Sequence, residues 1–339
     1  METQRIDILN GDYNSGIEKA ACLLKQGGIV AIPTETVYGL AASAYCDDAI
    51  KKVFLAKGRP QDNPLIVHIC DIDMLKDVAD EIPKSAYLCA EKFWPGPLTL
   101  VLKSKGSVAK SVSAGLDTVA VRMPSETSAR DIIEKSGIPL AAPSANISGS
   151  PSPTTASHVI ADLDGKIDGV VFGNDCVVGV ESTVLSLVGE KPRLLRPGAV
   201  TVEQLTELLG EIVVDKAVLS EPESDEKVAS PGMKYKHYSP KAQVYLVEGE
   251  SEAFAEFVNK HTDSMAVCFS EDKNINIKSV VYGSNLDEST LAHNIFSVLR
   301  ELDQMGAKKV YVHAPSRSGV GLAVFNRLIR AAAFRVIKL

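Results

Sequence analysis

The sequence predicts an α/β protein built from two domains. From residue 16 to about residue 200, short apolar runs with the length of buried strands alternate with segments of helical periodicity. After a polar and acidic stretch, a second alternation of the same kind begins at Gln243. The length of 339 residues agrees with two domains of about 150 residues each. We place the first domain at 1–212, an interdomain segment at 213–241 and the second domain at 242–339.

In the first domain, apolar runs bounded by polar, glycine or proline residues predict strands, and helical periodicity predicts helices. The predicted strands are Gly28–Pro33, Leu65–Cys70, Thr99–Lys103, Thr118–Met123, Pro139–Ala142, Gly169–Phe172 and Ser182–Val188. The predicted helices are Ile17–Gln26, Ala49–Lys57 and segments near 72–80, 84–92, 127–136 and 154–163. No Gly-x-Gly-x-x-Gly motif follows the first strand, so the strand order stays open and a dinucleotide fold has no direct support.

The second domain contains the same two kinds of element. Its predicted strands are Val244–Val247, Met265–Phe269, Val280–Tyr282 and Val310–His313. Its predicted helices are Glu252–Lys260, Ser289–Met305 and Gly321–Ala333. The segment between the domains changes character along its length: 220–227 is polar and acidic, as linkers are, but 230–240 is too aromatic and basic for a passive spacer.

Composition narrows the class of protein. A hydrophobic content of 45% and a charged content of 23% are typical of globular proteins with full cores, and no apolar run reaches the ~18–20 residues that span a bilayer. The N-terminal residues lack the pattern of a signal peptide, so we expect a cytoplasmic protein without membrane contact. The six cysteines are scattered, which indicates neither a zinc site nor a disulfide framework. A net charge of −7 argues against a broad electrostatic grip on nucleic acid.

The first candidate binding loop follows the predicted helix Ala49–Lys57. Gly58 suits a helix C-cap and Pro60 prevents continuation, so Lys57 and Arg59 lie at a chain reversal. Two cations at this place have a simpler structural explanation, since cations at a helix C-terminus complement the dipole of the helix. The functional alternative is a phosphate site, with Lys57 as a point charge and Arg59 making forked contacts.

Two predicted strands each carry one residue that is unusual in a buried strand. His68 shares a face with Ile66, where a histidine is either a satisfied core residue or a ligand contact. Arg122 shares a face with Thr118, and an arginine there requires a partner. That partner is either an internal Asp or Glu or a ligand carboxylate or phosphate.

A second candidate loop follows Leu140 and combines a strand end, a polar stretch rich in Gly and Pro, and a helix start. Ser144 and Asn146 supply two neutral hydrogen-bonding side chains. A helix start favours anions, although an ordinary loop with a Ser or Thr N-cap has the same composition. Paired with Lys57 and Arg59, this loop suits a nucleoside triphosphate better than most other ligands. Farther on, Arg196 lies at a predicted turn, where a surface position is the simpler alternative.

Several ordered motifs together resemble the threonylcarbamoyl-AMP synthase family in its long, two-domain form. The resemblance covers nearly the whole chain. The motifs are Pro33-Thr-Glu-Thr-Val-Tyr-Gly-Leu40, Lys57-Gly-Arg59-Pro, Asn63-Pro-Leu, Phe93-Trp-Pro-Gly-Pro-Leu-Thr99, Val121-Arg-Met-Pro, Ala142-Pro-Ser-Ala-Asn-Ile-Ser-Gly149, Glu181-Ser-Thr-Val, Leu195-Arg-Pro-Gly, Ser230-Pro-Gly-Met-Lys-Tyr-Lys-His-Tyr238 and Gly321-Leu-Ala-Val-Phe-Asn-Arg327.

The resemblance implies a twisted α/β, YrdC-like catalytic domain with a concave cavity, and a small Rossmann-like C-terminal domain. It implies a nucleotidyltransferase that makes threonylcarbamoyl-AMP and pyrophosphate from L-threonine, bicarbonate and ATP, with Mg²⁺ accompanying ATP. Other proteins then transfer the threonylcarbamoyl group to the adenosine beside the tRNA anticodon. We therefore expect handover to a transferase complex, and no stable tRNA binding by this chain.

Site residues follow from the resemblance, position by position. The threonine contacts would be Thr36, His68, Arg122, Ala142 and Ser182. The ATP contacts would be Arg59, Asn63, Thr118, Ser144, Ser152, Arg196 and Tyr235. The predicted catalytic residues are Lys57, Arg59, Ser144 and Asn146, with Lys57 and Asn146 contacting phosphates. The segment 230–238 is predicted to be a lid that carries Tyr235 into the nucleotide site, and Lys234 and Lys236 stand where the family often has arginine.

Two other readings differ in class. One is an RNA-binding or ribosome-associated module that uses the concave cavity, which the acidic balance and the missing aromatic-basic RNA signature disfavour. The other is a carbamoyl transferase of the hydrogenase-maturation type, which would need further domains and zinc-type cysteine pairs that this chain lacks. Neither a metal-ligand set nor a general base is evident in the sequence.

Overall fold

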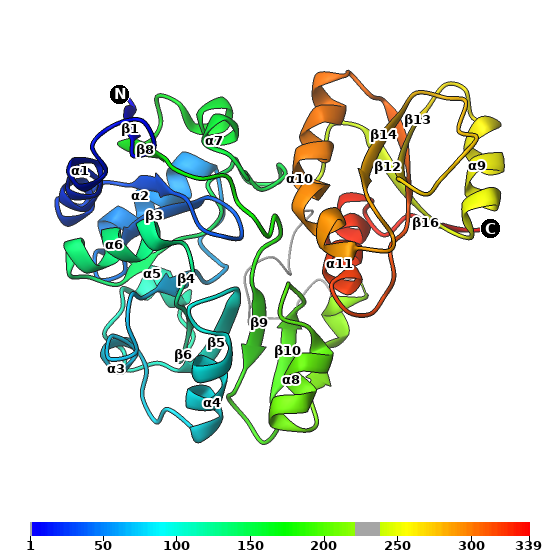
Figure 1. Ribbon diagram of the computed structural model, residues 1–339. Helices are drawn as coiled ribbons and strands as arrows, with labels where there is room; N and C mark the ends of the chain where they lie inside the picture. Colours follow the sequence, from blue (N-terminus) through cyan, green and yellow to red (C-terminus); the bar gives the residue numbers. More distant parts are fainter. Residues whose placement is uncertain (1, 221–237) are drawn as a thin grey trace.

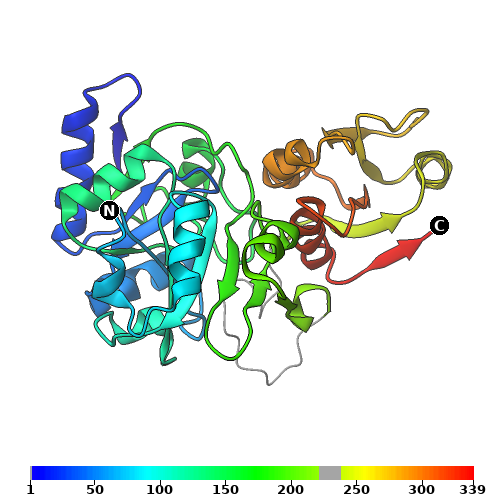
Figure 2. The same ribbon diagram turned by 60° about the horizontal axis from the view of Figure 1, so that its bottom comes forward.

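The structure is a computed structural model that describes residues 2–220 and 238–339. It contains two separate sheets, one in each half of the chain, and the two halves lie side by side (Figure 1). In both views, α10 and α11 lie between the second sheet and the first half of the chain, while α9 is on the far side (Figure 2). The predicted α/β class is confirmed for both halves.

The first sheet has eleven strands in the order β1-β8-β2-β3-β7-β4-β6-β5-β9-β10-β11. Its strands are β1 Gln4–Asp7, β2 Val30–Ile32, β3 Gly39–Ser43, β4 Ile66–His68, β5 Leu98–Lys103, β6 Thr118–Arg122, β7 Leu140–Ala141, β8 Gly169–Phe172, β9 Thr183–Ser186, β10 Arg193–Arg196 and β11 Val213–Val214. The helices of this half are α1 Tyr13–Lys25, α2 Asp47–Lys57, α3 Leu75–Val78, α4 Lys84–Phe93, α5 Lys110–Ser113, α6 Thr127–Ser136, α7 Ala156–Leu163 and α8 Val202–Leu209, followed by the 3₁₀ turn η1 Lys216–Val218.

Mixed pairing in the middle of this sheet sets the geometry of the site. Strand β7 runs antiparallel to both β3 and β4, whereas β4 and β6 are parallel. In this register His68 lies beside Arg122, and Thr99 of the antiparallel β5 lies on the other side of Arg122. Three polar side chains far apart in the sequence therefore meet at neighbouring strand ends.

The second sheet has five strands in the order β14-β13-β15-β12-β16, and all of its pairs are parallel. Its strands are β12 Gln243–Glu248, β13 Met265–Phe269, β14 Ser279–Gly283, β15 Lys309–His313 and β16 Val336–Lys338. The helices are α9 Ser251–Asn259, α10 Glu288–Gln304 and α11 Gly321–Ala331. Helices connect all the strands that are consecutive in the chain except β13 and β14, and this parallel arrangement agrees with the Rossmann-like unit that the resemblance implies.

Some elements were not predicted. Strand β3 has the sequence Gly-Leu-Ala-Ala-Ser and lacks the β-branched and aromatic residues by which strands are usually found, yet it is fully buried. Edge strand β1 has one buried residue in four, so it gives little alternation of polar and apolar positions. Arg196 was placed at a turn with a surface position as the simpler alternative, which is wrong: it ends strand β10 and is 6% exposed.

Candidate active site

A cavity that is open to solvent at its mouth lies where the ends of β4, β6 and β7 meet the C-terminus of α2. Its walls are made by residues from four stretches of chain, 34–39, 57–68, 142–150 and 181–182, and by the single positions Arg122, Arg196 and Tyr238. Of the residues predicted from sequence, those that line it are Thr36, Lys57, Arg59, His68, Arg122, Ala142, Ser144, Asn146, Ser182 and Arg196. Segments distant in the sequence therefore form one polar site.

Arg122 occupies the inner wall and is 3% exposed. The sequence left its partner open, and the structure supplies an internal one: Nη2 lies 2.8 Å from Oε1 of Glu35. Nη1 also donates to Oγ1 of Thr36 at 2.8 Å. Burial alone would raise the pKa of Glu35, but the charge and hydrogen bond of Arg122, together with backbone hydrogen bonds, hold that pKa below its ordinary value. Both groups are thus charged, and the guanidinium still faces the cavity.

His68 is a neutral wall residue. Burial lowers its pKa to about 3, and the positive charge of Arg122 acts in the same direction. Nδ1 donates to the carbonyl of Ile66 at 3.2 Å. The histidine is therefore satisfied within the protein, as one of the two alternatives had it, and it lies on the cavity wall, where contact with a ligand stays a prediction.

Lys57 ends α2 but does not extend into the cavity as a loose point charge. The residue is 2% exposed, and Nζ donates to the carbonyl of Ser144, to the carbonyl of Asn146 at 2.7 Å and to Oδ1 of Asn146 at 3.3 Å. Burial holds the pKa of Lys57 well below its usual value. These three hydrogen bonds fasten the second candidate loop, and contact of Lys57 with phosphates stays a prediction.

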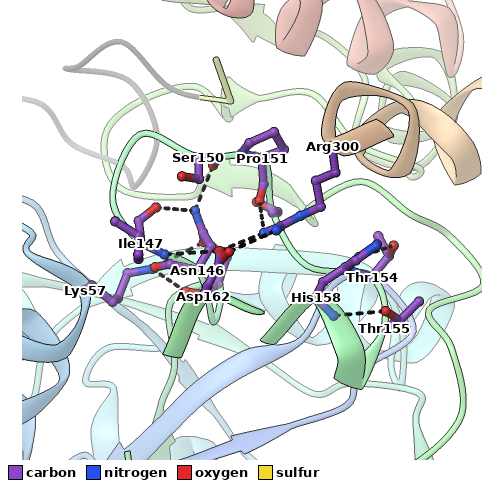
Figure 3. Close-up of polar contacts among 12 residues, drawn as sticks. Lys57, Asn146, Ile147, Ser150, Pro151, Thr154, Thr155, His158, Asp162 and Arg300 are labelled. Atoms are coloured by element: carbon purple, nitrogen blue, oxygen red, sulfur yellow. Dashed lines mark hydrogen bonds and ion pairs between the residues drawn. The ribbon is translucent and has the colours of Figure 1, made fainter. Parts of the chain in front are cut away.

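The second candidate loop is further ordered from within (Figure 3). Oγ of Ser144 donates to Oδ1 of Asn146 at 2.6 Å, and the amide nitrogen of Asn146 donates to the carbonyls of Ile147 and Ser150 at 2.9 and 2.8 Å. Arg59 lies nearby at the rim, where Nη2 donates to the carbonyl of Asn63 at 3.4 Å. The predicted pairs Lys57/Arg59 and Ser144/Asn146 thus meet on one wall.

Arg196 and Ser182 form another wall. Nε of Arg196 donates to the carbonyl of Ser182 at 3.0 Å, and Nη2 donates to its Oγ at 3.1 Å. The same Oγ lies 2.7 Å from Oγ1 of Thr99. Burial lowers the pKa of Arg196 to about 10, with the neighbouring charge of Arg327 adding to the effect. The group remains a cation at neutral pH.

Three predicted ATP contacts lie outside the cavity walls. Ser152 is fully buried and donates to Oε1 of Glu181 at 2.5 Å. Thr118 begins β6, four positions before Arg122, opposite Lys103 of β5. Asn63 is 1% exposed, and its amide has no hydrogen-bond partner among the described residues. These three residues match the family's ATP contacts in sequence, but none of them lines the cavity.

The predicted ATP contact Tyr235, together with Lys234 and Lys236, lies outside the described residues. The same holds for the predicted lid, 230–238, apart from its last residue. That residue, Tyr238, does line the cavity, with its ring centroid 5.1 Å from that of Phe296.

Some site residues were missed by the sequence analysis. Thr34 lines the cavity and exchanges hydrogen bonds with Thr36, and the Pro-Thr-Glu-Thr motif was a signal that could have indicated it. Glu181 lies in the wall and pairs with Arg327 of α11 at 2.8 Å. Burial would raise the pKa of Glu181, but the charges of Arg327 and Arg196 hold it below its ordinary value. No local pattern could have indicated a partner almost 150 positions away.

In 2–220 and 238–339, His, Cys, Asp and Glu form no group of three that could hold a metal ion. Within those ranges, no helix has both the length and the apolar character needed to cross a membrane.

Comparison with known proteins agrees with this geometry. A family model described as telomere recombination matches residues 22–198, and the model of the threonylcarbamoyl-AMP synthase C-terminal domain matches 200–333. The threonylcarbamoyl-AMP synthase of Bacillus subtilis is 45% identical over 330 residues, which are 95% of this chain and 94% of the relative. The Schizosaccharomyces pombe enzyme of the same name is 38% identical, over 98% of this chain and 92% of the relative.

A solved structure extends the similarity to the fold. The crystal structure of Pyrococcus abyssi Sua5 complexed with L-threonine is 40% identical, covers 100% of both chains and superposes with a TM-score of 0.92. Both halves and their arrangement are thus shared with a member of known structure. On these grounds the chain belongs to the threonylcarbamoyl-AMP synthase family.

Proposed function

We propose that this chain synthesises threonylcarbamoyl-AMP and pyrophosphate from L-threonine, bicarbonate and ATP. The observation that carries the proposal is the meeting of two anion-binding walls in one cavity. One wall holds Arg122 beside Thr36 and His68, and the other holds Arg59 and the Ser144–Asn146 loop. An amino acid carboxylate and a triphosphate are both anionic, so a site that joins them must neutralise both.

Threonine is assigned to the inner wall. Arg122 keeps N–H groups beyond those that contact Thr36 and Glu35, so it can form a charge-assisted pair with a carboxylate. His68 is neutral at physiological pH, so it adds no charge that would compete with Arg122. The complex of the related Pyrococcus protein with L-threonine supports threonine as a substrate.

ATP is assigned to the outer wall. Arg59 and Arg196 are cations at neutral pH and border the cavity, while Ser144 and Asn146 offer neutral hydrogen-bonding groups. Mg²⁺ enters as part of the MgATP substrate. The carboxylates in and beside the described walls, Glu35 and Glu181, are each paired with an arginine, so phosphates and water would supply the metal's ligands.

In the reaction, the neutral amine of threonine attacks the carbon of bicarbonate, water leaves, and a carbamate forms; with carbon dioxide instead, the amine loses a proton and the same carbamate forms. A carbamate oxygen then attacks the α-phosphorus of ATP, the bond to the bridging oxygen breaks, and pyrophosphate leaves. The protein contributes alignment, up to ~7–11 kcal/mol in the best cases, and stabilisation of the charge that develops on the phosphate. The product is then handed over to a threonylcarbamoyl transferase complex.

The test is pyrophosphate release from ATP, with L-threonine and bicarbonate each supplied or withheld. We expect release only when all three are present, together with a product of AMP linked to threonylcarbamate in the mass spectrum. Release of pyrophosphate without threonine would contradict the proposal, because the cavity would then serve a different acceptor.

A further inference from the structure

Arg300 of α10, in the second half of the chain, contacts residues that hold the loop of the nucleotide wall (Figure 3). Its guanidinium forms a fork with Asp162 of α7: Nη1 donates to Oδ1 at 3.0 Å and Nη2 to Oδ2 at 2.8 Å. Nη2 also donates to the carbonyl of Pro151 at 2.6 Å. The side chains of Arg300 and Asp162 are 11% and 13% exposed, so the pair is largely shielded from water.

Both partners of Arg300 belong to the framework of the Ser144–Pro151 loop. Oδ2 of Asp162 accepts the backbone N–H of Ile147 at 3.4 Å, next to Asn146. Pro151 closes the same loop. Arg300 therefore fixes the loop at its middle, through Asp162, and directly at its end.

The neighbouring turn of α10 makes a second contact of this kind. Ser297, three positions before Arg300 and thus on the same helix face, has its Oγ 3.1 Å from Oγ1 of Thr154. Thr154 follows the loop by three residues. One face of α10 therefore contacts both the framework of the loop and the residues that directly follow the loop.

We infer that Arg300 is a positioning residue for the nucleotide site, supplied by the C-terminal half of the chain. The inference rests on the proposed function, which places phosphates at the Ser144–Asn146 loop. Lys57 fastens the loop from the inner side and Arg300 fastens it from the outer side. An arginine suits this position because its planar fork serves a carboxylate and a carbonyl at once, which the single ammonium of lysine cannot reproduce.

The alternative is that Arg300 only holds the two halves together. The two explanations differ in what they predict for the substrates. A positioning role changes ATP binding and leaves threonine binding alone, because the loop lies on the nucleotide wall. If Arg300 only holds the two halves together, its substitution lowers the stability of the protein and changes neither the affinity for ATP nor that for threonine.

The experiment measures ATP affinity by equilibrium binding without threonine, and KM for ATP and for threonine, in the full chain. Arg300→Met and Asp162→Asn are each expected to weaken ATP binding about tenfold, as the loss of a charge-assisted contact does, with KM for threonine within about twofold of wild type. Arg300→Lys should restore part of the loss. The double variant should be no worse than either single variant, because both remove one network.

His293→Ala is the matched control. His293 lies on the same helix and also contacts the first half, through the carbonyl of Val177 at 3.1 Å, but not the loop. We expect wild-type ATP affinity in this variant. Wild-type ATP affinity in a folded Arg300→Met protein, or an equal loss in His293→Ala, would overturn the inference.

Asp162→Asn keeps the test decisive if Arg300→Met does not fold, because it retains the shape of the side chain. Unchanged ATP affinity in that variant also overturns the inference. Failure of the proposed function is seen separately, as wild-type protein that releases no pyrophosphate with threonine and bicarbonate. The ATP-binding measurement does not depend on that turnover.

Discussion

His68 has different protonation in the folded and the unfolded chain. In the folded chain burial lowers its pKa to about 3, whereas the ordinary value is 6.5. Between these values the unfolded chain binds the proton and the folded chain does not. Folding is therefore favoured at higher pH, and this contribution to stability is lost progressively as pH falls from 6.5 towards 3.

We predict that His68→Gln reduces the pH dependence of stability. A single site contributes at most about 1.4 kcal/mol to the free energy of unfolding for each pH unit inside the window. Denaturant unfolding at pH 7, 6 and 5 should show the wild type losing stability more steeply than the variant, by up to that slope. Parallel pH profiles for the two proteins would mean that His68 is not kept neutral by the fold.

The sequence predicted the individual residues of the inner wall better than their partners. The alternation of strand β6 placed Arg122 in a buried strand and required a counter-charge. The actual partner, Glu35, lies in the connection between β2 and β3, almost ninety positions away in the chain. Such a pair depends on strand order, and the order of this sheet could not be deduced from local patterns.

At the scale of elements, α2 and the loop after β7 form one unit through Lys57. The ammonium group satisfies two carbonyls and one side-chain oxygen of that loop. The helix end is well defined, because Gly58 adopts φ 60° as its left-handed C-cap and Lys57 is the last helical residue. The position of the loop therefore follows from where α2 ends.

We predict that Lys57→Met lowers the free energy of unfolding and also weakens ATP binding. Leaving buried acceptors without a donor costs about 1–3 kcal/mol. Lys52→Met is the matched control, since Lys52 lies on the same helix and donates to the carbonyl of Gly27 at the surface. Denaturant unfolding and ATP binding should both change in the first variant and stay near wild type in the second. If the variant loses activity but keeps its stability, Lys57 contacts the phosphates without stabilising the fold, and the prediction is wrong.

The elements that the sequence predicted correctly share a clear pattern. Strands β8 and β13 have the predicted bounds, because their apolar runs are continuous and end at polar or glycine residues. Strands β3 and β10 were missed, because one consists mainly of small residues and the other has arginine at both ends. Burial of these two depends on their neighbours in the sheet rather than on their own composition.

At the scale of the molecule, the two halves share an apolar core. Val37 and Val180 of the first half belong to the same buried cluster as Leu291 and Phe296 of α10. The pair of Glu181 with Arg327 of α11 adds a buried ionic contact between the halves. The cavity wall therefore depends on docking of the second half, which no local pattern in either half could predict.

Gly179 is the position where this docking is tightest against α10. It has φ +81°, and a Cβ there would lie 2.4 Å from Cα and from the carbonyl oxygen of His293, and 2.5 Å from the carbonyl oxygen of Ala292. These are backbone atoms of α10, the helix that carries Arg300, so they cannot yield as a flexible side chain would. The close approach requires glycine.

We predict that Gly179→Ala lowers the free energy of unfolding by roughly 2–4 kcal/mol, the sum of positive-φ strain and overpacking. Gly106→Ala is the matched control, because Gly106 has φ +77° with no atom within 4 Å of an added Cβ. It should show only the strain, about 1–2 kcal/mol. Because displacing α10 also displaces Arg300, ATP affinity should fall in Gly179→Ala and not in Gly106→Ala. Equal stability losses in the two variants, with unchanged ATP affinity, would show that the approach of α10 does not govern the nucleotide wall.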